Sequence, residues 1–255
     1  MTNPILKKLY FSPVKSLSFS SKESLKIKKN TGIQNDRIFA FTRIINETEA
    51  NNYEKNPNKR NLNFFLTLRN SPFLNKYNFE YKENELSLLL EKKLIKKISL
   101  NYNNNLKLIS EELKKLEASI NYVPYLIKNV DFPFFDTMPQ NSISLINMNS
   151  IKDFEKKIYH KIDHERFRGN IYINNIDPWL EFSWINKKIL INDCSFTVLK
   201  KISRCSATNL RLNSDKFDIN LPQKLKEVYE HTYMGIYLIP LNDGVININD
   251  KIKLA

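Results

Sequence analysis

Short runs in which apolar and polar residues alternate dominate the first part of the chain. Alternation with a period of two is typical of half-buried β-strands. Residues 46–62 break this pattern because they are polar and rich in Asn and Lys, and we interpret them as a surface loop. Strands this short and frequent indicate an antiparallel sheet or a barrel. The predicted strands cover residues 6–11, 25–28, 38–41, 64–67, 86–90 and 95–100.

Helical spacing of apolar residues occurs at three places farther along. Ser110 precedes two glutamates and predicts the start of a helix whose apolar positions continue through residue 120. Ser150 and Asp153 resemble a capping box ahead of a second helix with apolar residues at 151, 154, 158 and 162. Pro222 occupies a position typical of the first turn of a third helix. Prolines at 124, 133 and 139 interrupt the chain after the first helix, so we place a domain boundary near residues 105–125.

The second part of the chain returns to strands. Residues 142–146, 171–173, 189–191 and 196–199 are predicted strands, and the clearest strand pattern follows Asp243 and Gly244, where four apolar residues alternate with polar ones up to residue 254. Together the two parts predict an α+β protein that is mainly β.

Composition and charge exclude several classes of protein. With 42% hydrophobic residues in 255, the chain can form a packed core in one or two domains. The net charge of +13 is compatible with nucleic acid, acidic membranes or small anions as ligands. The lysines are spread along the chain, and no nucleic-acid-binding motif is present. We therefore assign the charge to solubility and expect no nucleic-acid polymer as a partner.

Two cysteines are too few for a disulfide scaffold or for an iron–sulfur cluster. No run approaches the roughly 18 apolar residues of a membrane span, and the N-terminus lacks the apolar core of a signal peptide. We therefore expect a cytoplasmic protein with no membrane span.

Cys205 is the residue with the clearest chemical potential. It follows a β-rich run and lies next to Arg204, and a neighbouring positive charge favours the thiolate, which attacks electrophiles or binds soft metals. From the residues alone, a reactive nucleophile, a metal ligand and a plain structural thiol all remain open. Cys194, by contrast, alternates with Phe196 and Val198, so we interpret it as a core residue.

Four further segments place polar residues at the edges of predicted strands, where a rigid scaffold can direct them at a ligand. The first ends in Lys15 and Ser16, and the second in Asp36 and Arg37. The others are residues 166–170, with sequence Arg-Phe-Arg-Gly-Asn, and residues 234–237, with sequence Met-Gly-Ile-Tyr.

In this order, the segments resemble the MOSC superfamily, named after the C-terminal domain of molybdenum-cofactor sulfurase. They are similar to the subset with an N-terminal β-barrel domain, which includes the amidoxime-reducing proteins. The resemblance rests on residues 13–16, 32–37, 67–69, 166–170, 178–181, 203–205, 235–237 and 244–250. It implies an N-terminal β-barrel-like domain at residues 1–115, followed by a MOSC β-barrel with peripheral helices at residues 116–255.

The resemblance also implies a site for the molybdenum cofactor (molybdopterin). Cys205 would be the catalytic residue and the ligand of the metal. Lys15 and Arg37 would contact the phosphate, with Ser16 supplying a hydroxyl. The other implied cofactor-binding residues are Arg168 and Asn170 at the polar edges of the pterin, and Ser203, Arg204 and Tyr237, which would close the site.

The implied activity is that of an oxidoreductase that reduces small N-hydroxylated compounds, with electrons from a separate flavin or iron–sulfur reductase. The alternative is a carrier of persulfide sulfur or of the cofactor, without redox turnover. A degenerate relative without any cofactor is a third, weaker possibility.

Three departures from the family pattern and several simpler interpretations qualify this hypothesis. Gly169 replaces the usual proline, Phe182 replaces an aspartate, and Asn209 lies where a Val-Asp-Pro stretch is common. The pairs Asp36–Arg37 and Arg166/Arg168 are also compatible with surface ion pairs. We expect Trp179 and Glu181 to be structural. His160 and His164 have a spacing that can bind zinc, but we expect them to be solvated because no third ligand is evident.

Overall fold

A curled eight-stranded sheet, shaped like half a barrel, is the largest element of this computed structural model, which describes residues 3–17, 19–101, 105–135, 139 and 141–254. The strand order is β16–β12–β13–β14–β10–β11–β1–β2. The strands are β1 (Ile5–Phe11), β2 (Ser20–Lys22), β10 (Ile143–Asn147), β11 (Ile171–Asn174), β12 (Lys188–Ile191), β13 (Cys194–Ser203), β14 (Tyr233–Pro240) and β16 (Ile252–Leu254).

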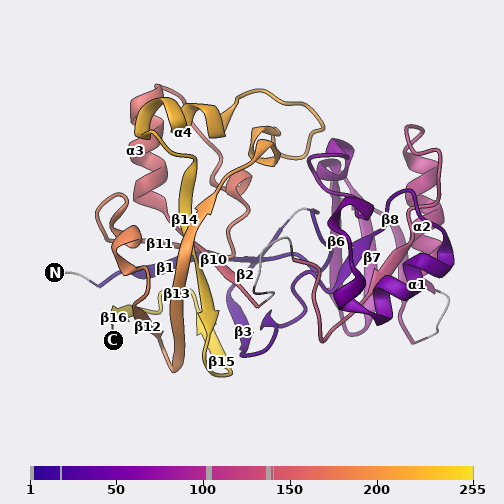
Figure 1. Ribbon diagram of the computed structural model, residues 1–255, viewed down its shortest axis with the longest axis horizontal. Helices are drawn as coiled ribbons and strands as arrows, with labels where there is room; N and C mark the ends of the chain where they lie inside the picture. Colours follow the sequence, from indigo (N-terminus) through magenta and orange to yellow (C-terminus); the bar gives the residue numbers. More distant parts are fainter. Residues whose placement is uncertain (1–2, 18, 102–104, 136–138, 140, 255) are drawn as a thin grey trace.

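Within the described residues, three smaller sheets and four α-helices accompany the large sheet (Figure 1). The sheets are β15 (Gly244–Asn247), β3 (Ser24–Lys28) and β4 (Gly32–Ile33); β5 (Phe39–Phe41) and β9 (Leu126–Lys128); and β6 (Tyr77–Lys82), β7 (Glu85–Leu90) and β8 (Lys93–Ser99). The helices are α1 (Glu47–Lys55), α2 (Asn105–Leu116), α3 (Met148–Ile158) and α4 (Leu221–Tyr229). Figure 1 shows α3 and α4 beside the large sheet, and α1 and α2 beside β6–β8 in the other half. The predicted fold class, mainly β with peripheral helices, is confirmed.

The first strands of the chain pair with strands from its last part. β1 pairs with β11, and β3 pairs with β15. Residues 5–28 therefore extend two sheets in which every other strand except β4 comes from residue 143 onward. The division into domains at residues 115 and 116 stays a prediction, and these pairings place the first strands of the chain against strands of its second half.

Alternating burial explains why these segments form strands. In β3, Leu25 and Ile27 are buried while the intervening lysines are exposed, so one face of the strand meets the core. Cys194, Phe196 and Val198 are likewise buried on one face of β13, which confirms that Cys194 is a core residue. One apolar cluster lies under the large sheet and a second fills the half that contains β6–β8.

The expected loop at residues 46–62 is wrong, because α1 occupies most of it. Asn46 caps the helix: its Oδ1 accepts the Glu49 backbone N–H at 2.9 Å, and the Glu49 carboxylate accepts the Asn46 N–H at 3.1 Å. This reciprocal pair is a capping box, and its sequence signature was hidden within a polar stretch.

Two predicted helix starts are also wrong. Ser110 lies inside α2, where its Oγ accepts the Leu126 N–H at 2.8 Å. Asn147, three residues before Ser150, caps α3. α3 ends at Ile158 because Tyr159 adopts a left-handed conformation (φ 52°), so His160 and His164 do not share a helix. Pro222 lies in the first turn of α4, as predicted.

Among the strands, the prediction for 64–67 is wrong. A 3₁₀ turn (Leu62–Phe64) occupies its start, and only an isolated bridge joins Phe65 to Thr42. The terminal pattern is split into two strands, because Asn249 (φ 71°) turns the chain and sends β15 and β16 to different partners. β6 was not predicted from the sequence.

Candidate functional site

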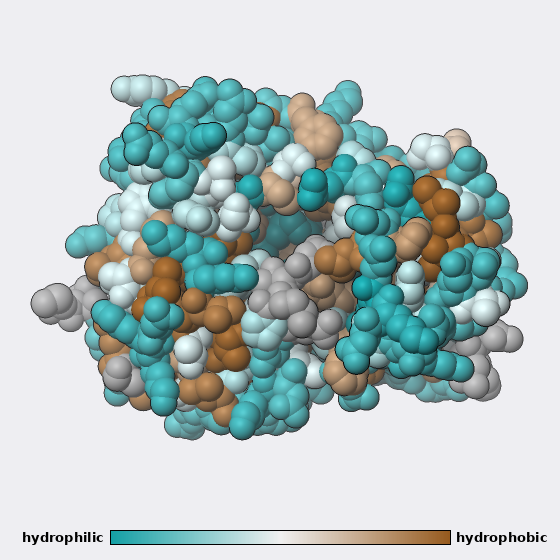
Figure 2. Space-filling model, viewed as in Figure 1, coloured by the Kyte–Doolittle hydropathy of each residue, from teal (hydrophilic) through white to brown (hydrophobic). Residues whose placement is uncertain are grey.

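A cavity of about 880 Å³ brings together eight of the nine residues predicted for the site. Its walls come from both halves of the chain. Figure 2 shows that this face of the molecule is hollowed at its centre, between the two halves. The eight predicted residues that line the cavity are Ser16, Arg37, Arg168, Asn170, Ser203, Arg204, Cys205 and Tyr237. We call it the arginine cavity, because five arginines line it.

The charge of the arginine cavity is strongly positive. Neither Asp nor Glu occurs among its described lining residues, although Asp36, buried beneath the wall, pairs with one of the five arginines, Arg37. Clustered charges of one sign in a concave site attract a ligand of opposite charge, and guanidinium groups match the geometry of phosphate oxygens. The five arginines are Arg37, Arg43, Arg69, Arg168 and Arg204.

Cys205 lies just beyond the end of β13 and is exposed with a free thiol. It begins a short 3₁₀ turn (Ser206–Asn209), and its carbonyl accepts the Thr208 N–H at 3.1 Å and the Thr208 hydroxyl at 2.9 Å. These bonds fix the backbone while leaving the sulfur at the cavity. No group of three or more His, Cys, Asp or Glu residues suited to a metal occurs in the described chain.

Arg204 is held rigidly next to this thiol. Its Nε and Nη2 donate to the Met234 carbonyl and its Nη1 donates to the Phe167 carbonyl at 2.7 Å, with the Nε bond at 2.9 Å. The guanidinium also lies 5.6 Å from the centroid of the Phe167 ring. Burial lowers the pKa of Arg204 from its ordinary value. The result is a fixed cation beside Cys205, as the sequence indicated.

Arg37 and Arg168 lie against the same aromatic ring. Their guanidinium carbons are 5.0 Å and 4.7 Å from the centroid of Phe19, within the range of cation–π contacts. Arg168 Nη2 also donates to the Leu17 carbonyl at 2.7 Å. Ser16, Arg37 and Arg168 all adopt left-handed backbone conformations, with φ between 51° and 65°. Such conformations in non-glycine residues are uncommon and cluster at functional sites.

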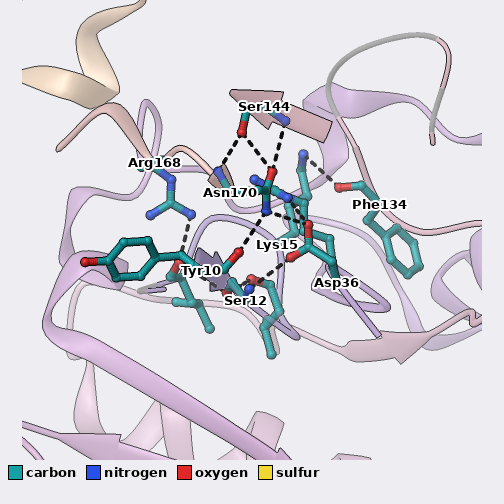
Figure 3. A network of polar contacts seen from close by, with 11 residues as sticks. Tyr10, Ser12, Lys15, Asp36, Phe134, Ser144, Arg168 and Asn170 are labelled. Carbon is teal, nitrogen blue, oxygen red and sulfur yellow. Dashed lines mark hydrogen bonds and ion pairs between the residues drawn. The ribbon is translucent and has the colours of Figure 1, made fainter. Parts of the chain in front are cut away.

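A buried carboxylate supports the floor of the arginine cavity (Figure 3). Asp36 is 1% exposed, accepts the Ser12 N–H at 2.9 Å and forms an ion pair with Arg37. Its other partner is Asn170, whose Nδ2 donates at 3.1 Å. Burial raises the pKa of Asp36, and the Arg37 charge and these hydrogen bonds oppose that rise.

The Asn170 amide is used within the protein. Nδ2 donates to Asp36 and to the Tyr10 carbonyl, while Oδ1 accepts the backbone N–H and the hydroxyl of Ser144. All four hydrogen-bonding positions of the amide are thus occupied. Asn170 therefore joins β1, β10 and the Asp36 cluster under the cavity, which is a positioning role.

Lys15 does not line the arginine cavity. Its side chain is buried, and Nζ lies 3.5 Å from the Phe134 carbonyl (Figure 3). The backbone N–H of Lys15 donates to the Phe39 carbonyl at 2.8 Å, which ties the segment to β5. Its predicted contact with phosphate stays a prediction.

The interpretation of the arginine segments as surface ion pairs and that of His164 as a solvated residue are both wrong. Arg166 is buried and pairs bidentately with Asp218, with both N–O distances 2.6 Å, and the pair Asp36–Arg37 is buried as described. His164 is half-buried, accepts or donates a 2.9 Å bond with the Tyr10 hydroxyl, and has its pKa lowered to about 4 by burial. His160 is exposed, as expected.

Glu181 and Trp179 stabilise the start of α3 and are not among the residues that line the arginine cavity. Glu181 is fully buried and accepts bonds from Asn147 at 3.0 Å and from Ser150 at 2.9 Å. Ser150 Oγ also accepts the Trp179 N–H at 2.8 Å. These contacts join the start of α3 to the 3₁₀ turn Leu180–Trp184 and confirm a structural role.

The three departures from the family pattern are accommodated locally. The Gly169 N–H donates to the Tyr172 hydroxyl at 3.0 Å, and a Cβ there would lie 2.6 Å from Ile146 Cδ1, so this site suits glycine. Phe182 packs against Trp179, and Asn209 Oδ1 accepts the Leu221 N–H at 3.0 Å.

Sequence reasoning missed two of the five arginines as site residues. Arg69 closes the segment 67–69 that contributed to the family resemblance, and that resemblance was the available signal. Arg43 follows β5 in the same way that the predicted residues follow other strands. Strand-end position alone therefore pointed to Arg43.

The chain is similar to two solved structures and to one family model. A search of curated proteins finds no match. The YuaD protein from Bacillus subtilis is similar over 98% of this chain and 94% of its own, with 11% identity and a TM-score of 0.45. YiiM from Geobacillus stearothermophilus is similar over 44% of this chain and 53% of its own, with 14% identity and a TM-score of 0.35. In the described part of the chain, no helix has the length and apolar character needed to span a membrane. The family model that matches is that of the MOSC domain, and it covers residues 135–253.

Proposed function

We propose that this protein binds the molybdenum cofactor in the arginine cavity, with Cys205 as the protein ligand of the metal, and reduces small N-hydroxylated compounds. The observation that carries the proposal is an exposed thiol in a cavity lined by five arginines and by no described carboxylate. MOSC domains are associated with this cofactor. Electrons would come from a separate flavin or iron–sulfur reductase.

The residues present fit such a group. The cofactor is a polar pterin with an anionic phosphate and a soft metal site, and it needs cations, hydrogen-bond donors and a thiolate. The cavity offers guanidinium groups, the Ser16 and Ser203 hydroxyls and one thiol. A single thiol suits a metal whose other ligands come from the cofactor. When bound, the cofactor supplies the redox chemistry at its metal.

The role of the protein's own residues is to bind and orient the cofactor. Arg37 and Arg168, fixed against Phe19, present two cations to the anionic end of the ligand. Arg204 places a positive charge next to Cys205 and is held by the Met234 and Phe167 carbonyl groups, so its orientation does not depend on the ligand. Lys15 and Tyr237 complete the proposed set of cofactor-binding residues, and Asn170 positions β1 and β10 beneath them.

The test is to purify the protein from a host that makes the cofactor and to measure molybdenum. We expect about one metal per chain in the wild type and almost none in Cys205→Ser. Cys194→Ala is the matched control, because that thiol is buried in β13 and should leave the metal content unchanged. Circular dichroism checks that each variant is folded.

Activity is then measured as reduction of a hydroxylamine by the loaded protein with an artificial reductant. Stoichiometric metal with turnover supports the full proposal. Metal without turnover supports a cofactor carrier, and cyanide-releasable sulfur on Cys205 without metal supports a persulfide carrier. Either of these outcomes would contradict the reductase.

A further inference from the structure

Two of the five arginines in the arginine cavity are outside the proposed set of cofactor-binding residues. These are Arg43 and Arg69. Phe41 and Leu68, which lie close to them in the chain, are buried in the apolar cluster of the half that contains β6–β8. Cys205 instead follows β13 of the large sheet, and Figure 2 shows the hollow between the two halves. A molecule in the arginine cavity can therefore contact the two arginines on one side and the thiol on the other.

Backbone hydrogen bonds place the two arginines on neighbouring segments. Residues 41–43 run beside residues 64–66, and the Arg43 N–H donates to the Phe64 carbonyl at 2.8 Å. Arg69 follows three residues after the paired segment. Both arginines therefore belong to the same wall of the cavity, and the backbone of that wall is held by the protein itself.

The turn that carries Arg69 is fixed by the side chain of Asn70. Asn70 Oδ1 accepts the Thr67 N–H at 2.8 Å, and its Nδ2 donates to the Phe65 carbonyl at 3.0 Å. The Thr67 carbonyl accepts the Ser71 N–H at 2.8 Å. Arg69 itself is exposed, so a fixed turn presents a solvated guanidinium at the cavity.

The surroundings of these two arginines differ from those of Arg37. Asp36 pairs with Arg37, whereas no ion pair of Arg43 or Arg69 occurs within the described part of the chain. Arg43 lies near Tyr122, where burial raises the pKa of the phenol and the Arg43 charge opposes that rise. Guanidinium groups in a concave site attract an anion, and each can bind a carboxylate through two parallel N–H groups.

We propose that Arg43 and Arg69 bind a carboxylate on the substrate, so that the substrates are N-hydroxylated compounds that also carry an anionic group. The N-hydroxyl part of this assignment rests on the proposed function, whereas binding of the carboxylate depends only on the two arginines. Arg37 and Arg168 remain available for the cofactor phosphate. Arg43 and Arg69 determine specificity and take no part in the reaction.

The test compares para-carboxybenzamidoxime with benzamidoxime, which lacks the carboxylate. In ligand-observed NMR titrations of the metal-free protein, we expect wild type to bind the carboxylate compound about tenfold more tightly, because charge-assisted hydrogen bonds are added. Arg69→Gln should bind the two compounds equally. Lys93→Gln is the matched control, because it removes one exposed positive charge of β8 outside the cavity lining and should keep the preference. Equal affinities in wild type, or an unchanged preference in Arg69→Gln, would overturn the proposal.

Metal content separates this proposal from the cofactor site. Arg69→Gln from a host that makes the cofactor should hold as much molybdenum as wild type, whereas Arg37→Gln should hold much less. Equal losses in the two variants would assign Arg69 to the cofactor and overturn the proposal. The denaturation midpoint of Arg69→Gln should match that of wild type, because the side chain is exposed. A wild type without molybdenum would contradict the proposed function, and the NMR comparison would still decide the carboxylate site.

Discussion

Two buried carboxylates in this protein have similar burial and different neighbours. Glu181 is fully buried, and its hydrogen-bond donors are the neutral side chains of Asn147 and Ser150, which brace α3. Asp36 is almost as buried, but its partners Arg37 and Asn170 both line the arginine cavity. The Glu181 cluster joins elements of the fold to one another, whereas the Asp36 cluster ends in a cation at the arginine cavity.

Removing the Asp36 carboxylate should have the largest effect. Asp36→Ala leaves Arg37 without its ion-pair partner in a mostly buried position, and breaking such a pair costs about 3–5 kcal/mol of unfolding free energy. Urea denaturation measures this loss. Glu181→Ala is the matched variant and should lose less, about 1–3 kcal/mol, because no buried cation is left behind. Equal losses would contradict the distinction between the two clusters.

Replacing Gly169 by proline, the residue usual in the family, should have the second-largest effect on stability. Gly169→Pro removes the N–H that donates to Tyr172, and its Cβ would meet Ile146, so we expect a loss of about 2 kcal/mol or more. In a Tyr172→Phe background the hydrogen-bond part of this loss should vanish. A proline variant as stable as wild type in thermal denaturation would show that the turn is not built for glycine.

The pH dependence of the stability of Glu181→Gln tests the description of the buried Glu181 cluster. Burial raises the pKa of Glu181 in the folded protein, so folding favours its protonated form. The corresponding stability is present below the unfolded-state pKa near 4.5 and is lost as pH rises through the folded-state pKa. The unfolding free energy of Glu181→Gln should therefore improve relative to wild type from pH 4.5 upward. Denaturation at several pH values measures this, and a constant difference would contradict it.

His164 should give the smallest effect. Its pKa is lowered to about 4 by burial, so the neutral ring is favoured in the folded state. The stability it contributes is present above its unfolded-state pKa of about 6.5 and is lost as pH falls toward 4. His164→Gln should flatten the decline of the denaturation midpoint between pH 6.5 and 4. His160→Gln, at an exposed position, should leave that decline unchanged.

The sequence predicts the elements in which local pattern and burial agree. Strands such as β3 and β13 were found because one face is apolar and the other polar. α1 was missed because its one buried residue is an alanine, so no apolar stripe marks the helix. β15 and β16 were predicted as one continuous strand because the turn between them depends on the left-handed backbone of Asn249, which the alternating pattern does not reveal.

For the site, the family resemblance predicted that Cys205, Arg37 and Arg168 share one site, and all three line the arginine cavity. It did not show that the Asn170 amide is used internally, because those partners are distant in the chain.

The central claim is that Cys205 binds the metal of a cofactor held in the arginine cavity. X-ray absorption at the molybdenum edge tests it directly on protein loaded with the cofactor. We predict one more sulfur neighbour of the metal in wild type and in Cys194→Ala than in any metal retained by Cys205→Ser. An identical sulfur count in all three proteins, with equal metal content, would contradict the account.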